Sequence, residues 1–430
     1  HMTLGVPTTL TDSIYFSEDG NTTYFSISGQ VTQYATEDID SLTFGSNSNT
    51  IFIQYNGTSV SVINPLAFEG VTVEVTGAHV IVNSSIETQD INYNLSGTTA
   101  NGMFKIYSEK RYNLILNGVN ITNPDGPAIN LQSEKKASVE LADGKMNSIA
   151  DGASYATAPP GGNGLPEDQK GTFFSEAKTV FSGTGTLSIA CNGSDQHALC
   201  SDDMIEITGG SITVTKATKD GIHAKDGLEI TGGTLDITST NDAIDADEAY
   251  ISISGGSITT TNSQAGANGI TCDSTITVSG GTLNLTVTGD QSKAIKSTQA
   301  MTLSGGNITI HNSGSVVLEA SGSGFNPAYC CAVKSEESVN LDGANLTITS
   351  SNNGAKSISS EGNISMSGGT INIANSGNGA RYKNASGVYV AYVPTCFSAD
   401  GNIMLTGGSV TTSCSGAGGR GITADGTLPV

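Results

Sequence analysis

The sequence predicts an all-β protein built as a right-handed parallel β-helix, a solenoid with about 24 residues and three strands in each coil. Three observations predict this fold. Glycine pairs recur at a nearly constant spacing, hydrophobic residues on both sides of each pair alternate with polar ones, and a short third segment of similar composition follows in every unit. The right hand follows from the crossover rule for parallel strands.

The glycine pairs mark one tight corner of each coil, where a Cβ would clash or the backbone needs a positive φ. Successive pairs lie 23, 23, 25 and 25 residues apart, at Gly209–Gly210, Gly232–Gly233, Gly255–Gly256, Gly280–Gly281 and Gly305–Gly306. The pattern continues to Gly407–Gly408 with two longer spacings of 38 and 39 residues. Each long spacing therefore contains an insertion of about 13 residues.

Strands are predicted from the two-residue period on both sides of the corner. Ile205 and Ile207 alternate with polar residues before one glycine pair, and Ile212 and Val214 do so after it. The third strand has a small residue, an aliphatic residue, a variable residue, another small residue and then an acid, as in residues 243–247. One side of each strand is therefore expected to be buried and the other exposed.

The two ends of the chain are expected to differ. Residues 1–100 keep alternating patterns but lose the glycine spacing, so we interpret them as an N-terminal β cap with irregular first coils that shields the end of the solenoid. Residues 101–430 form the regular β-helix. A loop at 155–171 and insertions near 319–333 and 381–396 are predicted to leave it.

Composition excludes several classes of protein. The 430 residues include 54 Gly and only 10 Pro without a collagen period, and no apolar run is long enough to span a membrane. A net charge of −22 argues against a nucleic-acid partner, and we expect a monomer. The seven cysteines are irregularly spaced, which favours buried thiols. His1 and Met2 have the form of a cloning remnant, so we expect that a signal peptide has been removed.

Aligning the third strands places equivalent residues of successive coils about 4.8 Å apart in outward-facing columns. One column contains Cys200, His223, Asp245, Thr271, Lys296, Lys334, Ser359, Ser398 and Thr423. Carboxylates gather in and beside its first coils, and their oxygens suit a hard cation, calcium rather than magnesium. The predicted calcium ligands are Asp202, Asp203, Asp220, Asp226, Asp242, Asp245 and Asp247. The alternative is that each Asp forms a turn at a coil corner.

Lys225 lies beside these acids and is the candidate base if the chain is an enzyme, because a metal can acidify the C5 proton of a uronate that a lysine then removes. The alternative is a salt bridge with Asp202, Asp226 or Asp247. His223 is expected at the surface or behind the ligands.

Basic residues and tyrosines recur at one corner of the later coils. We expect this strip to hold uronate carboxylates and to stack on sugar rings. Its members are Lys296, Lys334, Lys356, Arg381, Tyr329, Tyr382 and Tyr389. Loop packing and scattered charge are the alternative, and the absence of Trp argues against a flat aromatic platform for crystalline cellulose.

The glycine corners, the segments 219–223 and 241–245, and the stretch between residues 39–44 and 168–174 resemble the secreted carbohydrate-binding β-helix proteins of gut and plant-degrading anaerobes. That family is similar in fold to pectate lyases, and the resemblance implies calcium binding and association with cellulose and polygalacturonate without demonstrated cleavage. Residues 39–44 also resemble the N-terminal portion of Bacteroidetes surface lipoproteins, which implies a secreted or outer-surface location.

These observations are compatible with three functions: a binding protein, an enzyme and a structural protein. The first is calcium-dependent, non-catalytic binding of polysaccharide at the cell surface, with acidic plant-type glycans and possibly cellulose as ligands. The second is a calcium-dependent polysaccharide lyase of the pectate-lyase type, which would use Lys225. The third is an adhesin stalk. We expect binding rather than catalysis.

Overall fold

The chain is all-β throughout the residues that the computed structural model describes, which are 2–4, 11–27, 29–39, 48–161 and 164–429. These ranges contain no α-helix and one 3-10 turn, η1 (Thr36–Asp38). No described helix could span a membrane. Most strands lie in two large sheets whose neighbouring strands are mainly parallel. The prediction of an all-β chain with parallel strands is confirmed. Most of the segment 39–44 lies outside the described residues.

One sheet takes a single short strand from each turn of the chain. Its strands pair in parallel except for β7 and β8, which are antiparallel. In chain order they are β7 (Val71–Thr76), β8 (Ala78–Ser84), β10 (Gly102–Ser108), β12 (Ile129–Leu131), β15 (Gly171–Ser175), β18 (His197–Ser201), β21 (Ile222–Ala224), β24 (Ile244–Asp245), β27 (Ile270–Cys272), β29 (Lys293–Ser297), β33 (Cys331–Ser335), β35 (Lys356–Ser360), β39 (Thr395–Ala399) and β42 (Arg420–Ala424).

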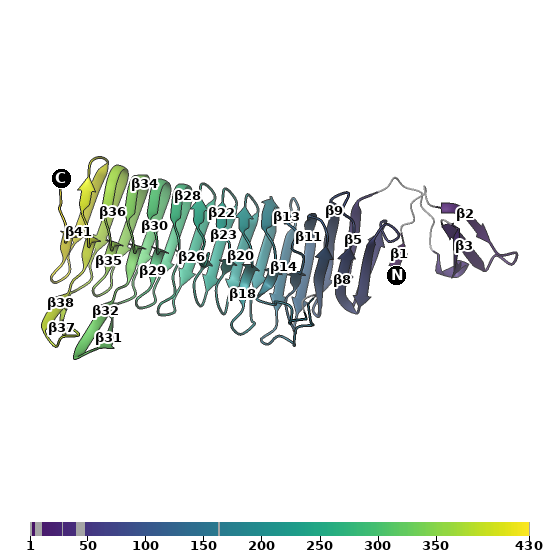
Figure 1. Cartoon of the computed structure of the whole chain (residues 1–430), viewed down its shortest axis with the longest axis horizontal. Coiled ribbons are helices and arrows are strands. Elements are labelled where there is room, and N and C mark those ends of the chain that lie inside the picture. Colours follow the sequence, from purple (N-terminus) through teal and green to yellow (C-terminus); the bar gives the residue numbers. More distant parts are fainter. Residues whose placement is uncertain (1, 5–10, 28, 40–47, 162–163, 430) are drawn as a thin grey trace.

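The other large sheet takes either two short strands or one long strand from each turn, before and after the glycine corner. Its strands are β1 (Met2–Leu4), β5 (Thr50–Asn56), β6 (Ser59–Asn64), β9 (Ile91–Thr99), β11 (Tyr112–Asn123), β13 (Ala137–Leu141), β14 (Met146–Asp151), β16 (Thr179–Gly183), β17 (Thr186–Ala190), β19 (Ile205–Ile207), β20 (Ser211–Lys216), β22 (Leu228–Ile230), β23 (Thr234–Ser239), β25 (Ile251–Ile253), β26 (Ser257–Asn262), β28 (Ile276–Val287), β30 (Met301–Asn312), β34 (Val339–Ser350), β36 (Ile364–Asn375), β40 (Ile403–Leu405) and β41 (Ser409–Cys414). Figure 1 shows these turns stacked along one axis.

The core is a set of aliphatic stacks that run through successive turns. Leu199 pairs with Ile222, Ile222 with Ile244, and Ile244 with Ile270. All four side chains are completely buried. The period-two pattern therefore positions the buried residues, because equivalent residues of neighbouring turns share one side of the sheet.

Three smaller sheets lie outside these stacks. β2 (Thr11–Phe16), β3 (Thr22–Ile27) and β4 (Gln30–Ala35) form an antiparallel sheet near the N-terminus. Two hairpins arise within the long spacings: β31 (Val317–Ser321) with β32 (Gly324–Ala328), and β37 (Ala380–Lys383) with β38 (Tyr389–Tyr392). The hairpins lie side by side near the C-terminal end, where the Ser323 amide donates to the Ala385 carbonyl at 2.7 Å.

The glycine corners are constrained by the neighbouring turn. A Cβ on Gly255 would lie 2.3 Å from the carbonyl oxygen of Thr231, and Gly256 has a φ of +82°. Both residues of the pair are therefore needed, one for close approach and the other for its left-handed backbone. The requirement for glycine at these corners therefore comes from contact with the neighbouring turn as well as from the backbone conformation of the corner itself.

Replacing Gly255 with Ala should destabilise the protein by about 1–3 kcal/mol, because the added methyl meets backbone that cannot move without displacing the adjacent turn. Gly421→Ala is the matched control, since the nearest atom to its added Cβ is the Thr412 hydroxyl at 3.7 Å. Chemical denaturation of both variants checks this. Equal stabilities would show that the corner tolerates a side chain.

Candidate functional site

The predicted column of third-strand residues has the register that the sequence alignment gave it. Cys200, His223, Asp245 and Thr271 pair in succession, and the ladder continues through Lys296 to Thr423. The expectation that the whole column is exposed is wrong. Cys200, Thr271, Ser359 and Ser398 are buried. Cys200 pairs with Phe174 and His223, and Thr271 with Asp245 and Lys296, so larger side chains one turn away shield these two.

The seven predicted calcium ligands enter different contacts. Asp203 accepts a hydrogen bond from the amide of the next residue, Met204, at 2.5 Å. Asp226 and Asp247 are exposed, and Asp247 has a φ of 46°. The structure brings Asp220 and Asp245 together around His223, and it places Asp202 in a separate group.

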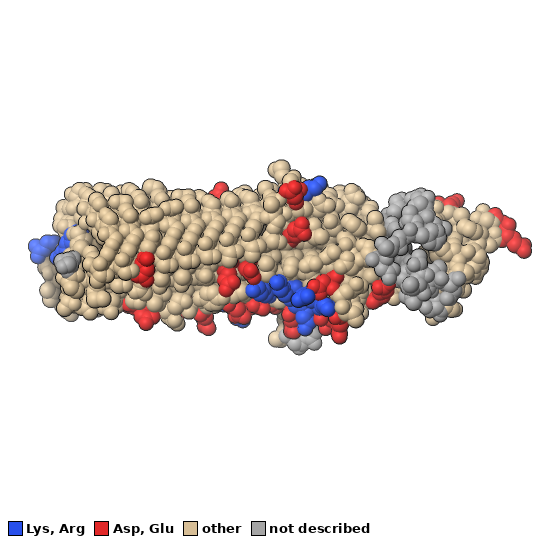
Figure 2. Space-filling view, turned by 90° about the horizontal axis from the view of Figure 1, so that it is seen from above, with Lys and Arg blue, Asp and Glu red and all other residues tan. Residues whose placement is uncertain are grey.

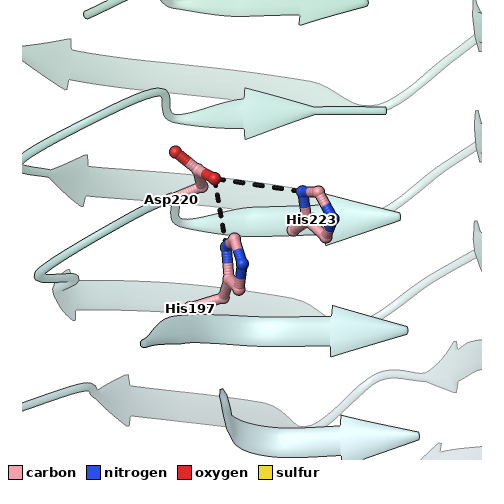
Figure 3. A group of neighbouring side chains, drawn as sticks. All are labelled: His197, Asp220 and His223. Carbon is pink, nitrogen blue, oxygen red and sulfur yellow. Dashed lines mark ion pairs between the residues drawn. The ribbon is translucent and has the colours of Figure 1, made fainter. Parts of the chain in front are cut away.

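Asp220 is a buried carboxylate between two histidines (Figure 3). Its Oδ2 lies 3.1 Å from His197 Nδ1 and 3.9 Å from His223 Nδ1. Its Oδ1 accepts hydrogen bonds from the Asn241 side chain at 2.7 Å and the Asp242 amide at 3.1 Å. Burial acts to raise the pKa of Asp220, but His197 and Asn241 lower it below the usual value. Asp220 therefore carries a negative charge inside the protein.

The two imidazoles stack on each other with ring centroids 4.3 Å apart. Burial lowers the pKa of His197. His223 is less deeply buried, and its Nδ1 also lies 2.9 Å from Asp245 Oδ2. The sequence predicts His223 at the surface or behind the predicted ligands, and the structure places it half-buried, with its ring nitrogen beside Asp220 and Asp245.

Asp242 lies one turn beyond Asp220 and is held in a different way. Its Oδ1 accepts the amide hydrogen of Asn268 at 2.5 Å. Burial, with the nearby charges of Asp220 and Asp245, raises the pKa of Asp242 to about 7. Its contacts connect it to the next turn of backbone.

Asp202 belongs to a group that contains only oxygen donors. One carboxylate oxygen each from Asp202, Asp168 and Glu176 lies within 4.8 Å of the others. Lys170 contacts Asp202 and also lies 2.8 Å from Asp168. Burial and the charges of Asp202 and Asp168 raise the pKa of Glu176 to about 7. The ammonium group of Lys170 thus compensates part of a concentrated negative charge.

The loop at 155–171 delivers Asp168 and Lys170 to this group. Glu167, at its end, pairs with Lys105 of β10 at 2.6 Å, and both side chains are 5% exposed. The Tyr107 hydroxyl donates to the other oxygen of Glu167. A buried ion pair and a tyrosine therefore fix the loop against the stacked turns.

Lys225 is exposed, and in the described part of the chain it forms no ion pair. Asp202, one of its expected partners, instead contacts Lys170. Among the described residues, the expected salt bridge of Lys225 with Asp202, Asp226 or Asp247 is thus not formed, and for Asp202 the loop at 155–171 supplies another cation.

The predicted basic strip separates into two parts. Lys296 pairs with Glu336 at 3.3 Å, and Lys334 pairs with Glu361 at 2.7 Å. Each lysine thus meets a glutamate from the following turn. These partners reduce the positive charge that the two lysines offer a ligand.

The second part combines cations with aromatic rings at the hairpins. Lys356 Nζ lies 4.4 Å from the centre of the Tyr329 ring. Arg381 Cζ lies 5.5 Å and Lys383 Nζ lies 5.2 Å from the centre of the Tyr389 ring. Tyr389 is 61% exposed. Tyr382 stacks with Tyr392, and their ring centroids are 6.1 Å apart. We call these residues the hairpin cluster.

Sequence reasoning missed His197, Asp168, Glu176 and Lys170. Leu199 pairs with Ile222 of the next turn. His197 lies two residues before Leu199, and Asp220 lies two residues before Ile222. Extending the alignment one turn back from Asp220 would therefore have found His197. Glu176 follows Ser175, which pairs with Ser201 directly before Asp202, so the same extension would have found Glu176 as well. Asp168 and Lys170 carry no such signal, because their position depends on the fold of an insertion.

Replacing Glu167 with Gln should destabilise the protein by about 3–5 kcal/mol, because the buried Lys105 loses its charged partner. The double variant Lys105→Met with Glu167→Met should recover much of this loss, since it leaves no unpaired charge. Denaturation of the single and double variants tests the pair. Additive losses would contradict this account.

The sequence profile described as "Carbohydrate-binding domain-containing protein" matches residues 76–379. A protein of that description from Acetivibrio thermocellus is 33% identical over 124 residues, which are 28% of this chain and 41% of the relative. The match thus spans less than half of the relative's length.

A solved polysaccharide lyase-like protein from C. thermocellum is similar with a TM-score of 0.41 and 22% identity, over 76% of this chain and 97% of the other. The profile match covers most of the stacked turns, both candidate acidic groups and the first hairpin. The chain belongs to the family of carbohydrate-binding domain-containing proteins.

Proposed function

We propose that this protein binds polysaccharide without cleaving it, as a monomer at the bacterial cell surface or in the secreted fraction. Family membership supports a carbohydrate ligand. The observation that carries the proposal for acidic glycans is the hairpin cluster, where Arg381 and Lys383 lie close to the exposed ring of Tyr389. The parallel pairing of successive turns further supports a right-handed parallel β-helix as the scaffold.

The hairpin cluster suits a sugar acid for two reasons. A tyrosine ring offers an apolar face to the C–H groups of a sugar, and a guanidinium group pairs with a carboxylate through two hydrogen bonds. Arg381, Lys383 and Tyr389 all belong to one hairpin, β37–β38. Because Lys296 and Lys334 are already paired with glutamates, the hairpin cluster is the stronger candidate for uronate binding.

A neutral glycan such as cellulose would use another surface. Thr259, Asn284, Thr309 and Thr347 pair in succession on β26, β28, β30 and β34, with short polar side chains facing outward. Figure 2 shows that most of one face of the molecule carries no charged side chain. Hydroxyl and amide groups repeated at about 4.8 Å form a ladder that could hydrogen-bond to successive sugar hydroxyls.

Retention on polygalacturonate should fall in the double variant Arg381→Ala with Tyr389→Ala, and it should weaken from low salt to about 0.5 M NaCl because exposed charges are screened. Lys296→Ala with Lys334→Ala is the matched control and should have a smaller effect. Affinity electrophoresis at several salt concentrations measures both. Equal retention of all three proteins would move the site away from the hairpins.

Calcium dependence is a further part of the proposal. The group of Asp168, Glu176 and Asp202 supports it, because its donors are all oxygen and calcium prefers such ligands. Calcium saturated at about 100 times its dissociation constant should stabilise the fold by about 2.7 kcal/mol. Melting of metal-free protein with and without calcium measures this stabilisation.

Asp202→Asn should abolish the calcium effect, whereas Asp226→Asn, at an exposed turn, should preserve it. Identical melting curves with and without calcium, together with no calcium in elemental analysis, would contradict the calcium proposal.

A calcium-dependent lyase is the second candidate, and the exposed position of Lys225 without an ion-pair partner in the described ranges favours it. Incubation with polygalacturonate or alginate and calcium would then produce absorbance from unsaturated products, which Lys225→Ala would remove. Retention without new absorbance supports binding alone. If the protein is neither retained nor produces new absorbance, the adhesin stalk remains as the interpretation.

A further inference from the structure

Two histidines and a carboxylate from consecutive turns meet at a point that the carbohydrate function does not use. His197 begins β18, His223 lies in β21, and Asp220 lies in the turn directly before β21 (Figure 3). One ligand atom from each lies within 4.8 Å of the other two. The group therefore draws its three donors from two adjacent turns.

We propose that His197, Asp220 and His223 form a zinc site that joins these two turns. Zinc binds imidazole nitrogen and carboxylate oxygen at about 2.0–2.2 Å, so tetrahedral ligand atoms lie about 3.3–3.5 Å from one another. The two distances from Asp220 Oδ2, 3.1 Å to His197 Nδ1 and 3.9 Å to His223 Nδ1, lie on either side of that value. Small side-chain rotations bring all three donors to the ion.

His197 gives independent support for a ligand. Its side chain is 4% exposed, and its Nδ1 is a buried atom that forms no hydrogen bond, although Asp220 Oδ2 is 3.1 Å away. The contact with Asp220 Oδ2 does not have the geometry of a hydrogen bond. A buried polar atom without a hydrogen bond is costly, and a metal ion would satisfy it. The charge of Asp220 in the same place offsets part of the charge of a divalent cation.

The donor set selects the class of metal. Calcium prefers six to eight oxygen ligands, whereas two imidazoles and one carboxylate are typical of zinc. Asp245 lies 2.9 Å from His223 Nδ1 and offers a further oxygen beside the site. This donor chemistry differs from that of the group at Asp202, so the two metals can be tested separately.

Lys219 opposes metal binding in the observed arrangement. Its Nζ lies 3.2 Å from His197 Nε2, where an ammonium group donates to the ring nitrogen and leaves the proton on Nδ1. A metal on Nδ1 requires the opposite tautomer, with the proton on Nε2, and the ammonium group must then move away. Removing Lys219 should therefore strengthen zinc binding.

Isothermal titration calorimetry tests the site. The full chain is first stripped of metal, excess calcium is then added, and zinc is titrated into this solution. We expect about one zinc ion per chain and a higher melting temperature with zinc. His223→Gln should weaken binding by more than about tenfold, and Lys219→Met should tighten it. His311→Gln and His1→Ser are the controls, because an exposed histidine or an N-terminal histidine can bind zinc on its own.

His223 is the preferred ligand to replace because its side chain is 15% exposed, so the variant should fold; melting in a chelator verifies this. His197→Asn and Asp220→Asn extend the test if they also fold. The proposal is overturned if zinc does not bind when calcium is in excess, if binding is lost in His1→Ser or His311→Gln, or if folded His223→Gln binds zinc as tightly as the unchanged chain. These outcomes leave the polysaccharide proposal untouched, since its test uses the hairpin cluster.

Discussion

Parallel pairing between equivalent residues of successive turns is the interaction on which the rest of the structure depends. It places Ile222 on Ile244 and Ile244 on Ile270, and it gives the glycine corners their close contact with the preceding turn. A change at one position therefore acts on two neighbours. The same pairing turns any residue repeated in the sequence into a column in space, with members about 4.8 Å apart.

This geometry controls the charges of the protein. Like charges at one position of successive turns would lie next to each other, so the columns need compensation. Lys296 with Glu336 and Lys334 with Glu361 provide it by pairing a lysine of one column with an acid of the next column and the next turn. In the earlier turns, His197 and a hydrogen bond from Asn241 compensate the charge of Asp220, and Lys170 compensates that of Asp202. Part of the negative charge of a chain with a net charge of −22 is thus compensated locally.

The insertions supply what the regular turns do not. The loop at 155–171 adds Asp168 and Lys170 to Asp202, and the second hairpin places two cations beside the Tyr389 ring. Repeated turns give a surface with one chemistry along its length, whereas a ligand is distinguished by local groups of different chemistry. The candidate sites therefore lie where insertions or unusual residues interrupt the repeat.

The sequence by itself determined the strands of the repeated turns, their register and the buried aliphatic residues, because a period of two and a recurring glycine pair allow one alignment of the turns. The columns from Cys200 to Thr423 follow from that alignment alone. Only the tertiary structure decided which members are exposed and which acids meet. Asp220 faces His197, and Asp202 meets Lys170 instead of Lys225. The reason is physical: register is a property of the repeated backbone, whereas side-chain direction and loop position depend on neighbours that differ from one turn to the next.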